Sequence, residues 1–488
     1  MRRRDFLAAT GGAWIGPGAV AAGTEKRSDS NTSYDKQRSY TAAAQTTSSP
    51  AHSLAGGERC FNDVYRGDYL NQIAFPLGGM GAGMICLEGT GALSKFSLRN
   101  RPDLSSEPTA FAAISLKDRH GSARVLEAPV PAWKLRPVFP AVDPEKIRGI
   151  SWGLPRFHHA AFATRFPFAT IQLHDPAIPL EVELTGWSPF FPGDADNASL
   201  PVAALEYRFN NRSGAPVEAV FSFHAENFLA QPPDPLDLKP NPNSLDRITP
   251  TQGGFVLYGS GGPDRPWDAA HCAIWTDAAD VKVNHVWFRG FPLDSMQRVW
   301  RDIATGACYE RAALPNACSP GASLFVPFTV SPGQSKTITL RLAWYVPNSN
   351  LVEDMEGAKD DKSVPGSHAS EAYQPWYASR FTGVQEVQNY WQSHYQPLRQ
   401  KSHAFAQTFY DSTLPPEIIE AIAANLTILK SPTVLRQTDG RLWCWEGIYD
   451  SSGGDPGSCC DGHLLGRQRR AVFQPSKSRG PSNGTEAV

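Results

Sequence analysis

A carboxylate next to two tryptophans marks the segment Thr438–Gly447, which reads Thr-Asp-Gly-Arg-Leu-Trp-Cys-Trp-Glu-Gly. Tryptophan rings offer flat apolar faces on which a pyranose ring can stack, and the glycine after Glu446 lets a ligand approach the backbone. Glu446 is therefore the candidate catalytic residue, and Trp443 and Trp445 are candidate sugar-binding residues. The structural alternative is that residues 442–445 form a buried strand and Glu446 caps its end.

Two helices are predicted just before this segment. Apolar residues recur at spacings of three and four from Val384 to Phe409, which is typical of a helix with one buried face. A second apolar stripe begins at Pro415-Pro416-Glu417, where proline is tolerated in the first turn, and Ser431-Pro432 ends it. These helices lead into the tryptophan-rich strand and predict the start of a helical domain.

The region from about residue 105 to residue 345 is a succession of short β-type runs separated by Pro, Gly, Asn and Asp. Several runs, such as Leu180–Thr185 and Ser335–Trp344, alternate apolar with polar residues, as strands with one buried face do. Asn210–Gly214 lies between two runs and has the composition of a turn. The sequence therefore predicts a large antiparallel β-sandwich.

A glycine run at Gly78–Gly83 precedes this region. It does not follow the dinucleotide-binding fingerprint, no lysine comes after it, and the segments that follow alternate as strands. We interpret the glycines as the small residues that closely packed strands and tight turns require.

The N-terminus resembles a twin-arginine export signal. Met1-Arg2-Arg3-Arg4-Asp5-Phe6-Leu7 is followed by a short apolar run that ends near Ala22, and Ala19-Val20-Ala21 has the small-x-small pattern of a cleavage site. The run is too short and too rich in glycine for a membrane span. We expect the Tat export machinery to carry the protein to the bacterial periplasm or outside the cell.

Composition limits the partners. The chain has 488 residues, 41% of them hydrophobic and 19% charged, with a formal net charge of -2. That charge provides no field to attract nucleic acid or an anionic membrane, and it suits a neutral substrate. We expect no cofactor, no nucleic-acid partner and no stable membrane span.

Eight cysteines are too few for a disulfide scaffold in a chain of this length. Cys308 and Cys318 would close a short loop if bonded, although buried thiols account for them equally well. Cys459, Cys460 and His463 do not reproduce the spacing of zinc ligands, so no metal site is expected.

The predicted organisation has six segments: 1–22, twin-arginine signal peptide; 23–59, disordered linker; 60–345, N-terminal β-sandwich domain; 346–383, linker; 384–458, start of an α-helical catalytic domain; 459–488, aberrant disordered tail.

Three parts of the sequence are specific enough to suggest a family. They are Ile73–Gly83 with Leu87–Gly91, Glu181–Phe190 and Asp439–Gly447. They resemble the glycoside hydrolase family 116 enzymes, which include bacterial β-glucosidases and non-lysosomal glucosylceramidases, with likeness from about Phe61 to Gly447. The resemblance implies an N-terminal β-sandwich packed on a C-terminal (α/α)6 barrel, a carbohydrate or glycolipid substrate, and Glu446 as catalytic nucleophile.

A retaining glycosidase needs a second carboxyl group, about 5 Å from the nucleophile, to protonate the leaving oxygen. The resemblance places that general acid on an aspartate well over a hundred residues beyond the nucleophile. Asp450, Asp455 and Asp461 are the only aspartates after Glu446 in this sequence, and none matches the acid motif. A barrel of about twelve helices has room here for two or three, so the fold expected is a β-sandwich followed by the first helices of an incomplete (α/α)6 barrel.

The last thirty residues lose both the family likeness and any apolar period after about Ser458. We hypothesise a frameshift there, which reading the gene in its other frames would test. The function expected is that of a retaining β-glucosidase or glucosylceramidase, inactive in this truncated form. The alternative is a non-catalytic β-sandwich module that contacts carbohydrate or is structural. The apolar faces of the helices at 384–430 count against that alternative, because they would lie exposed.

Overall fold

The computed structural model describes residues 59–99, 103, 106–117, 121–135, 149–230, 247–261, 266–288, 292–314, 319–349, 351–354, 374–444 and 470–473. They belong to one compact unit, Arg59–Val488. The predicted signal peptide at 1–22 and the predicted linker at 23–59, apart from Arg59, lie outside the described residues, as does most of the predicted tail at 459–488.

Antiparallel β-sheet is the main regular structure of the described chain. The largest sheet has eight strands, in the order β11 (Ile248–Thr251), β12 (Gly254–Gly259), β13 (Ala270–Thr276), β16 (Ser335–Tyr345), β9 (Val202–Asn211), β8 (Leu180–Trp187), β7 (Phe168–His174) and β6 (His159–Arg165). The second has five, in the order β14 (Lys282–Asn284), β15 (Gly321–Val330), β10 (Val217–Glu226), β4 (Ala110–Leu116) and β5 (Arg124–Val125).

Three small sheets accompany these two. They are β1 (Ala74–Leu77), β2 (Met84–Glu88) and β3 (Leu93–Ser97); β17 (Leu351–Asp354) with β20 (Arg470–Phe473); and β18 (Val434–Arg436) with β19 (Leu442–Cys444).

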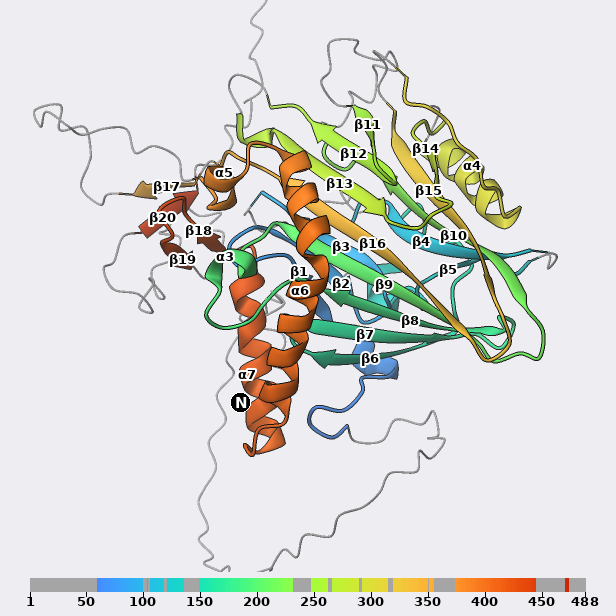
Figure 1. Ribbon diagram of the computed structural model, residues 1–488, viewed down its shortest axis with the longest axis horizontal. Helices are drawn as coiled ribbons and strands as arrows, with labels where there is room; N and C mark the ends of the chain where they lie inside the picture. The colour runs from blue at the N-terminus through green and yellow to red at the C-terminus, as the bar shows by residue number, and fades with distance from the viewer. Residues whose placement is uncertain are drawn as a thin grey trace, which may run out of the picture. The chain divides into compact units, whose positions relative to one another are not determined.

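The eight-stranded and five-stranded sheets pack face to face around one apolar core (Figure 1). Rings from the two sheets meet there: Tyr207 on β9 lies 5.0 Å from Phe221 on β10, and Phe209 lies 4.8 Å from Phe328 on β15, between centroids. The predicted β-rich N-terminal region is confirmed.

Strand β8 shows why the alternating pattern was informative. Leu180, Val182 and Leu184 are buried in the core between the sheets, whereas Glu181 and Thr185 point to the other face. Side chains of successive strand residues point to opposite faces, so the alternating sequence buries one face and leaves the other for a further layer.

The described part of the chain also contains helices. They are α2 (Ala132–Leu135), α3 (Ala195–Ala198), α4 (Pro292–Ala304), α5 (Tyr377–Arg380), α6 (Val384–Tyr410) and α7 (Pro416–Leu426), with the 3₁₀ turns η1 (Gly67–Leu70), η2 (Pro266–Asp268) and η3 (Thr427–Lys430). The two helices predicted after Val384 and Pro415 are confirmed as α6 and α7. Among the described helices, none is both long enough and apolar enough to cross a membrane.

Helix α4 lies within residues 105–345, a region for which the sequence predicted a β-sandwich and no helix. Met296, Val299 and Ile303 on this helix pack against Phe111 and Val125 of the five-stranded sheet. Their spacing of three and four residues places them on one helical face, which covers the outer surface of that sheet. The five-stranded sheet is therefore covered on its outer side by a helix that comes from within the β-rich region.

Helix α6 covers the outer face of the eight-stranded sheet (Figure 1). Trp391 and Tyr395 are buried there, 5.3 and 5.2 Å from the ring of Trp187 at the end of β8. The sequence left open whether Cys308 is bonded to Cys318 or is a buried thiol. Cys308 is an exposed free thiol, and Cys318 lies outside the described residues.

Candidate active site and its support on the sheets

The hairpin β18–β19 carries the chain to the candidate catalytic residue. Its register pairs Val434 with Cys444 and Arg436 with Leu442. The turn is closed by the Gly440 N–H, which donates to the Gln437 carbonyl over 2.9 Å, and Gly440 has a φ of +86°, a conformation that favours glycine. The described chain ends this hairpin at Cys444, two residues before Glu446.

The three residues singled out in the sequence fall at the edge of the described structure. Glu446 and Trp445 lie outside the described residues. Trp443 lies on β19 opposite Leu435, and its side chain is outside what the structure describes. The structure thus describes the hairpin that leads to the candidate carboxylate.

Arg436 anchors the hairpin to helix α3. Its guanidinium donates to the Ala195 carbonyl at 3.0 Å, to Ser199 Oγ at 3.2 Å and to Asp196 Oδ1 at 2.8 Å. The same guanidinium lies 4.3 Å from the ring centroid of Trp376, close enough for a cation–π contact. Because the planar guanidinium of Arg436 contacts several acceptors and a ring at once, the direction of its side chain is fixed. These contacts also hold the end of β18 in place.

The glycine run forms the surface on which the hairpin rests. A Cβ atom added to Gly81 would lie 2.2 Å from the backbone nitrogen of Arg436, and one added to Gly79 would lie 2.3 Å from the Leu200 carbonyl oxygen. Gly81 also has a φ of +67°. Only glycine allows the two backbones to come this close, so the interpretation of the run as a site of close packing is confirmed.

A buried lysine links the turn before the hairpin to the same place. Lys430, at the end of η3, donates to Ser188 Oγ at 2.6 Å and to the Ser188 carbonyl at 3.0 Å. Ser188 Oγ in turn donates to the Gly78 carbonyl over 2.7 Å. Burial lowers the pKa of Lys430 to about 7, and its Nζ is 5.5 Å from the Phe166 ring. The lysine therefore ties the helical segment to the glycine run through one serine.

The three segments that suggested a family thus converge. The glycine run belongs to the first, Ser188 to the second, and the turn and second strand of the hairpin to the third. Sequence reasoning did not find Arg436, Lys430 or Ser188 as individual contributors. A lysine at the end of the apolar stripe of the second predicted helix was the one visible signal, because a cation in such a setting needs buried acceptors.

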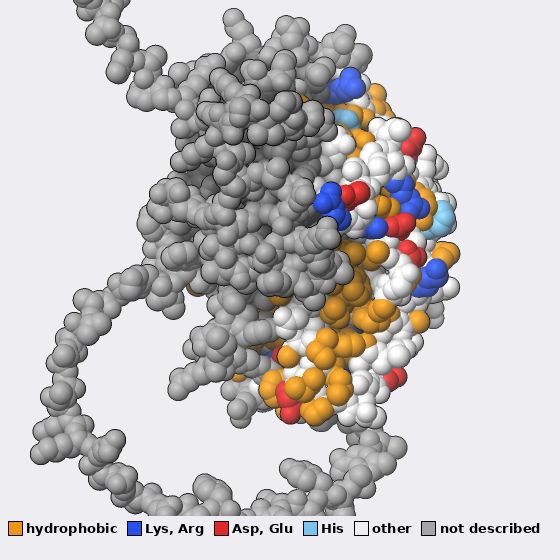
Figure 2. Space-filling model, turned by 90° about the vertical axis from the view of Figure 1, so that its left-hand side faces the viewer, with side chains coloured by type: hydrophobic (Ala, Val, Ile, Leu, Met, Phe, Trp, Pro, Cys, Tyr) orange, Lys and Arg blue, Asp and Glu red, His pale blue; other side chains and the backbone are white. Residues whose placement is uncertain are grey.

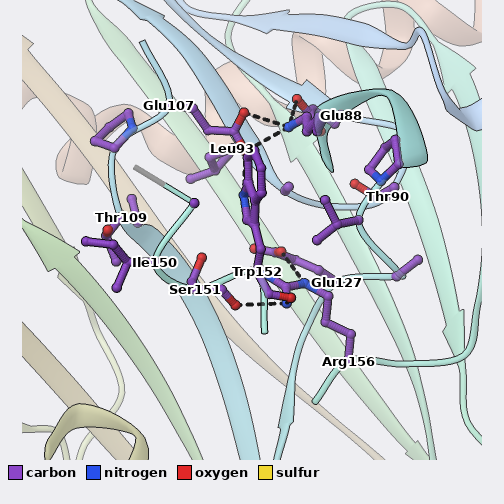
Figure 3. A pocket seen from close by; sticks show the side chains of 18 residues that line it. Glu88, Thr90, Leu93, Glu107, Thr109, Glu127, Ile150, Ser151, Trp152 and Arg156 are labelled. Carbon is purple, nitrogen blue, oxygen red and sulfur yellow. Dashed lines mark hydrogen bonds and ion pairs between the residues drawn. The ribbon is translucent and has the colours of Figure 1, made fainter. Parts of the chain in front are cut away.

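A second polar site lies elsewhere on the sheets (Figure 3). Lys134 Nζ is 2.7 Å from carboxylate oxygens of both Glu88 and Glu107, and Arg156 Nε is 3.2 Å from Glu127 Oε2. Figure 3 shows Trp152 lying between the two groups. Glu88 and Glu107 are two carboxyl groups that lie close together, as the two catalytic carboxyl groups of a glycosidase do.

The small volume of this second site excludes a sugar. Its cavity has a volume of about 20 Å³, which is room for about one water molecule. Burial raises the pKa of Glu127, and burial together with Glu88 raises that of Glu107. Burial alone would lower the pKa of Lys134, but Glu88 and Glu107 raise it above its usual value. The cluster is a buried ion-pair network. It links Glu88 on β2 and Lys134 on α2 to residues that flank the five-stranded sheet, Glu107 before β4 and Glu127 after β5.

A model of the family described as beta-glucosidase 2, glycosyl-hydrolase family 116 N-term, matches residues 74–398, more than half of the chain. The chain belongs to glycosyl-hydrolase family 116. The family 116 match includes the glycine run and Ser188, whereas Lys430 and Arg436 lie beyond it. The contacts described above therefore join the family 116 N-terminal domain to the segment that carries Glu446.

No curated protein matches the sequence. Among solved structures, the chain is similar to a putative kojibiose phosphorylase from the human microbiome, with 10% identity and a TM-score of 0.32 over 75% of this chain and 34% of that one. It is also similar to a polysaccharide lyase, with 11% identity and a TM-score of 0.22 over 56% of this chain and 33% of that one. The family 116 chain spans about a third of the length of either.

Proposed function

We propose that this family 116 protein is a retaining β-glycosidase that hydrolyses β-glucosides or glucosylceramide-like glycosides, with Glu446 as the nucleophile. The observation that carries the proposal is the docking of the hairpin β18–β19. Gly81 and Arg436 hold that hairpin against the N-terminal domain, and the chain reaches Glu446 two residues after it ends. A nucleophile must be held within a fraction of an ångström of its productive position, and a rigid support provides this.

The chemistry follows from one carboxylate and one acid. The Glu446 carboxylate would attack the anomeric carbon while the bond from that carbon to the leaving oxygen breaks, and the general acid would give the leaving oxygen its proton. Water then attacks the same carbon, frees the sugar and returns the carboxylate. Trp443 and Trp445 would offer their faces to the sugar, and Gly447 would let the ligand approach the backbone.

We also propose that α7 is the first helix of an (α/α)6 barrel. Its inner residue Ile419 is 5% exposed, but Ile418 and Ile422 are 45% and 37% exposed. Figure 2 looks onto the side where α7 lies in Figure 1 and shows hydrophobic side chains gathered in the lower part of that face. A helix that is apolar on both sides is typical of a position between two layers, because each face needs a cover.

The choice of aglycone separates the role of the nucleophile from that of the general acid. Protonation of the leaving group contributes about 100- to 10,000-fold to the rate of such a reaction. Hydrolysis of 2,4-dinitrophenyl β-glucoside, whose leaving group departs without a proton, should therefore depend on Glu446 and not on the general acid. Methyl β-glucoside should be cleaved at least about 100-fold more slowly.

Glu446→Gln tests the assignment of the nucleophile. The substitution should abolish hydrolysis of the dinitrophenyl glucoside, because an amide cannot attack the anomeric carbon. Glu417→Gln, at an exposed glutamate in the first turn of α7, is the matched control and should retain the activity. Equal activity in the Glu446→Gln variant and the unsubstituted protein would refute the assignment.

A further inference from the structure

A groove separate from the hairpin opens between helix α6 and the outer face of the eight-stranded sheet. It has a volume of about 420 Å³ and lies where the C-terminal half of α6 passes strands β6, β7 and β8. Small-molecule sites measure roughly 300 to 1,000 Å³, so the groove is large enough for one or two sugar units. Its lining includes the polar residues Arg165, Thr170, Thr185, Arg399, His403, Gln407, Tyr410 and Asp411.

The sequence of α6 explains why the groove exists. In the N-terminal half of the helix, large rings such as Trp391 and Tyr395 fill the space above the sheet. In the C-terminal half, Ala406 faces the sheet, where Thr170 on β7 is paired directly opposite Thr185 on β8. Small side chains on both sides leave the two layers apart, and the hydroxyl groups of the threonines line the gap.

One wall of the groove contains an ion pair between Arg399 and Glu206, and further hydrogen bonds hold this pair in place. Arg399 donates from Nε and Nη2 to the two carboxylate oxygens of Glu206, at 2.6 and 2.8 Å. The Glu206 carboxylate also accepts from the Tyr395 hydroxyl at 2.6 Å and from Trp187 Nε1 at 3.0 Å. The charge of Arg399 is therefore neutralised, and its side chain serves as a rigid part of the wall.

Arg165 differs from Arg399 because its charge is available. It is an exposed residue at the end of β6, and its guanidinium lies 4.6 Å from the ring centroid of Tyr410. Within the described part of the chain it forms no ion pair. His403 is also exposed and contacts Phe168 edge-on at 6.0 Å between centroids, while Asp411 is the acidic residue of the lining. Stacking on Tyr410 orients the Arg165 fork without using its hydrogen-bond donors.

We propose that this groove binds a sugar that carries an anionic group, such as a carboxylate or a phosphate. Arg165 holds the anionic group in a two-pronged hydrogen bond, which its planar fork favours. Thr170, Thr185, Gln407 and Asp411 offer donors and acceptors on both walls for the ring hydroxyls. The site does not depend on Glu446 and adds a binding function to the proposed hydrolysis.

Titration calorimetry on the whole chain tests this site with D-glucuronic acid, glucose 6-phosphate, D-glucose and inorganic phosphate. Glucuronic acid and glucose 6-phosphate should each bind at least about ten-fold more tightly than glucose, because they can form the charge-assisted pair with Arg165. Arg165→Gln should weaken binding of the acidic sugar by about 10- to 100-fold. Arg212→Gln, at an arginine whose side chain is 72% exposed and does not line the groove, should leave the affinity unchanged.

Three results would overturn the proposal. They are the absence of millimolar binding of both acidic sugars to the unsubstituted protein, equal affinity in the Arg165→Gln variant, and binding of inorganic phosphate as tightly as glucose 6-phosphate. The last result would show that the sugar hydroxyls contribute nothing. Glu446→Gln should bind the acidic sugar normally, so loss of hydrolysis and loss of groove binding are separate outcomes.

Discussion

Substitution of Gly81 by alanine should detach the hairpin that leads to Glu446. An alanine at a φ of +67° costs about 1–2 kcal/mol, because its Cβ crowds its own backbone. Its Cβ would also stand 2.2 Å from the backbone nitrogen of Arg436, and relief of such a contact by movement of the hairpin costs about 1–3 kcal/mol. We expect Gly81→Ala to lower the free energy of unfolding by about 2–5 kcal/mol.

Gly333→Ala separates these two contributions. Gly333 has a φ of +69°, and an added Cβ would meet nothing within 4 Å. This variant should therefore lose only the first 1–2 kcal/mol or so in urea-induced unfolding. Hydrogen exchange read by mass spectrometry should show faster exchange over residues 431–444 in Gly81→Ala and not in Gly333→Ala. Equal losses of stability in the two variants, with unchanged exchange in the hairpin, would refute the docking of the hairpin on the glycine run.

Two further predictions concern buried charges. The pKa of Lys430 is about 7 in the folded protein and about 10.4 in an unfolded chain, so the unfolded state binds more protons between these values and the free energy of unfolding should rise with pH from 7 to 9. Lys430→Met should abolish this rise in urea titrations at pH 7, 8 and 9, and an unchanged slope would contradict the assignment. Lys134→Met should cost about 3–5 kcal/mol at pH 7, because Glu88 and Glu107 would be left buried without their cation. Since burial favours the neutral form of Glu107, the loss should be smaller at pH 4.5, and the same loss at both pH values would show that the lysine is not neutralising these carboxylates.

Local pattern was sufficient for most of the fold. The strand predicted at Leu180–Thr185 is β8, and the helix predicted from Val384 is α6, because alternation and helical spacing are each set by one buried face. Helix α4 was missed although Met296, Val299 and Ile303 have helical spacing. Its polar residues and the loops around it resembled the turns between short strands, and the burial of its apolar face depends on a sheet formed from distant segments.

The contacts that hold the hairpin could not be predicted from the local sequence, for a different reason. Lys430 and Ser188 are 242 positions apart in the sequence, and Arg436 and Asp196 are 240 apart. Neither pair has a spacing or composition that reveals its partner. The glycine run was read correctly as a place of close packing, but its partner in that packing became visible only when the sheets and the hairpin were brought together.

Covalent trapping tests the central claim most directly. A 2-deoxy-2-fluoro-β-glucoside with a dinitrophenolate leaving group reacts with a glycosidase nucleophile and needs no acid to release its aglycone. After digestion, mass spectrometry should find one fluoroglucosyl group on Glu446, and none on that peptide in the Glu446→Gln variant. A fluoroglucosyl group on another carboxylate, or hydrolysis of the dinitrophenyl glucoside with the Glu446 peptide unmodified, would contradict the assignment of Glu446 as the nucleophile.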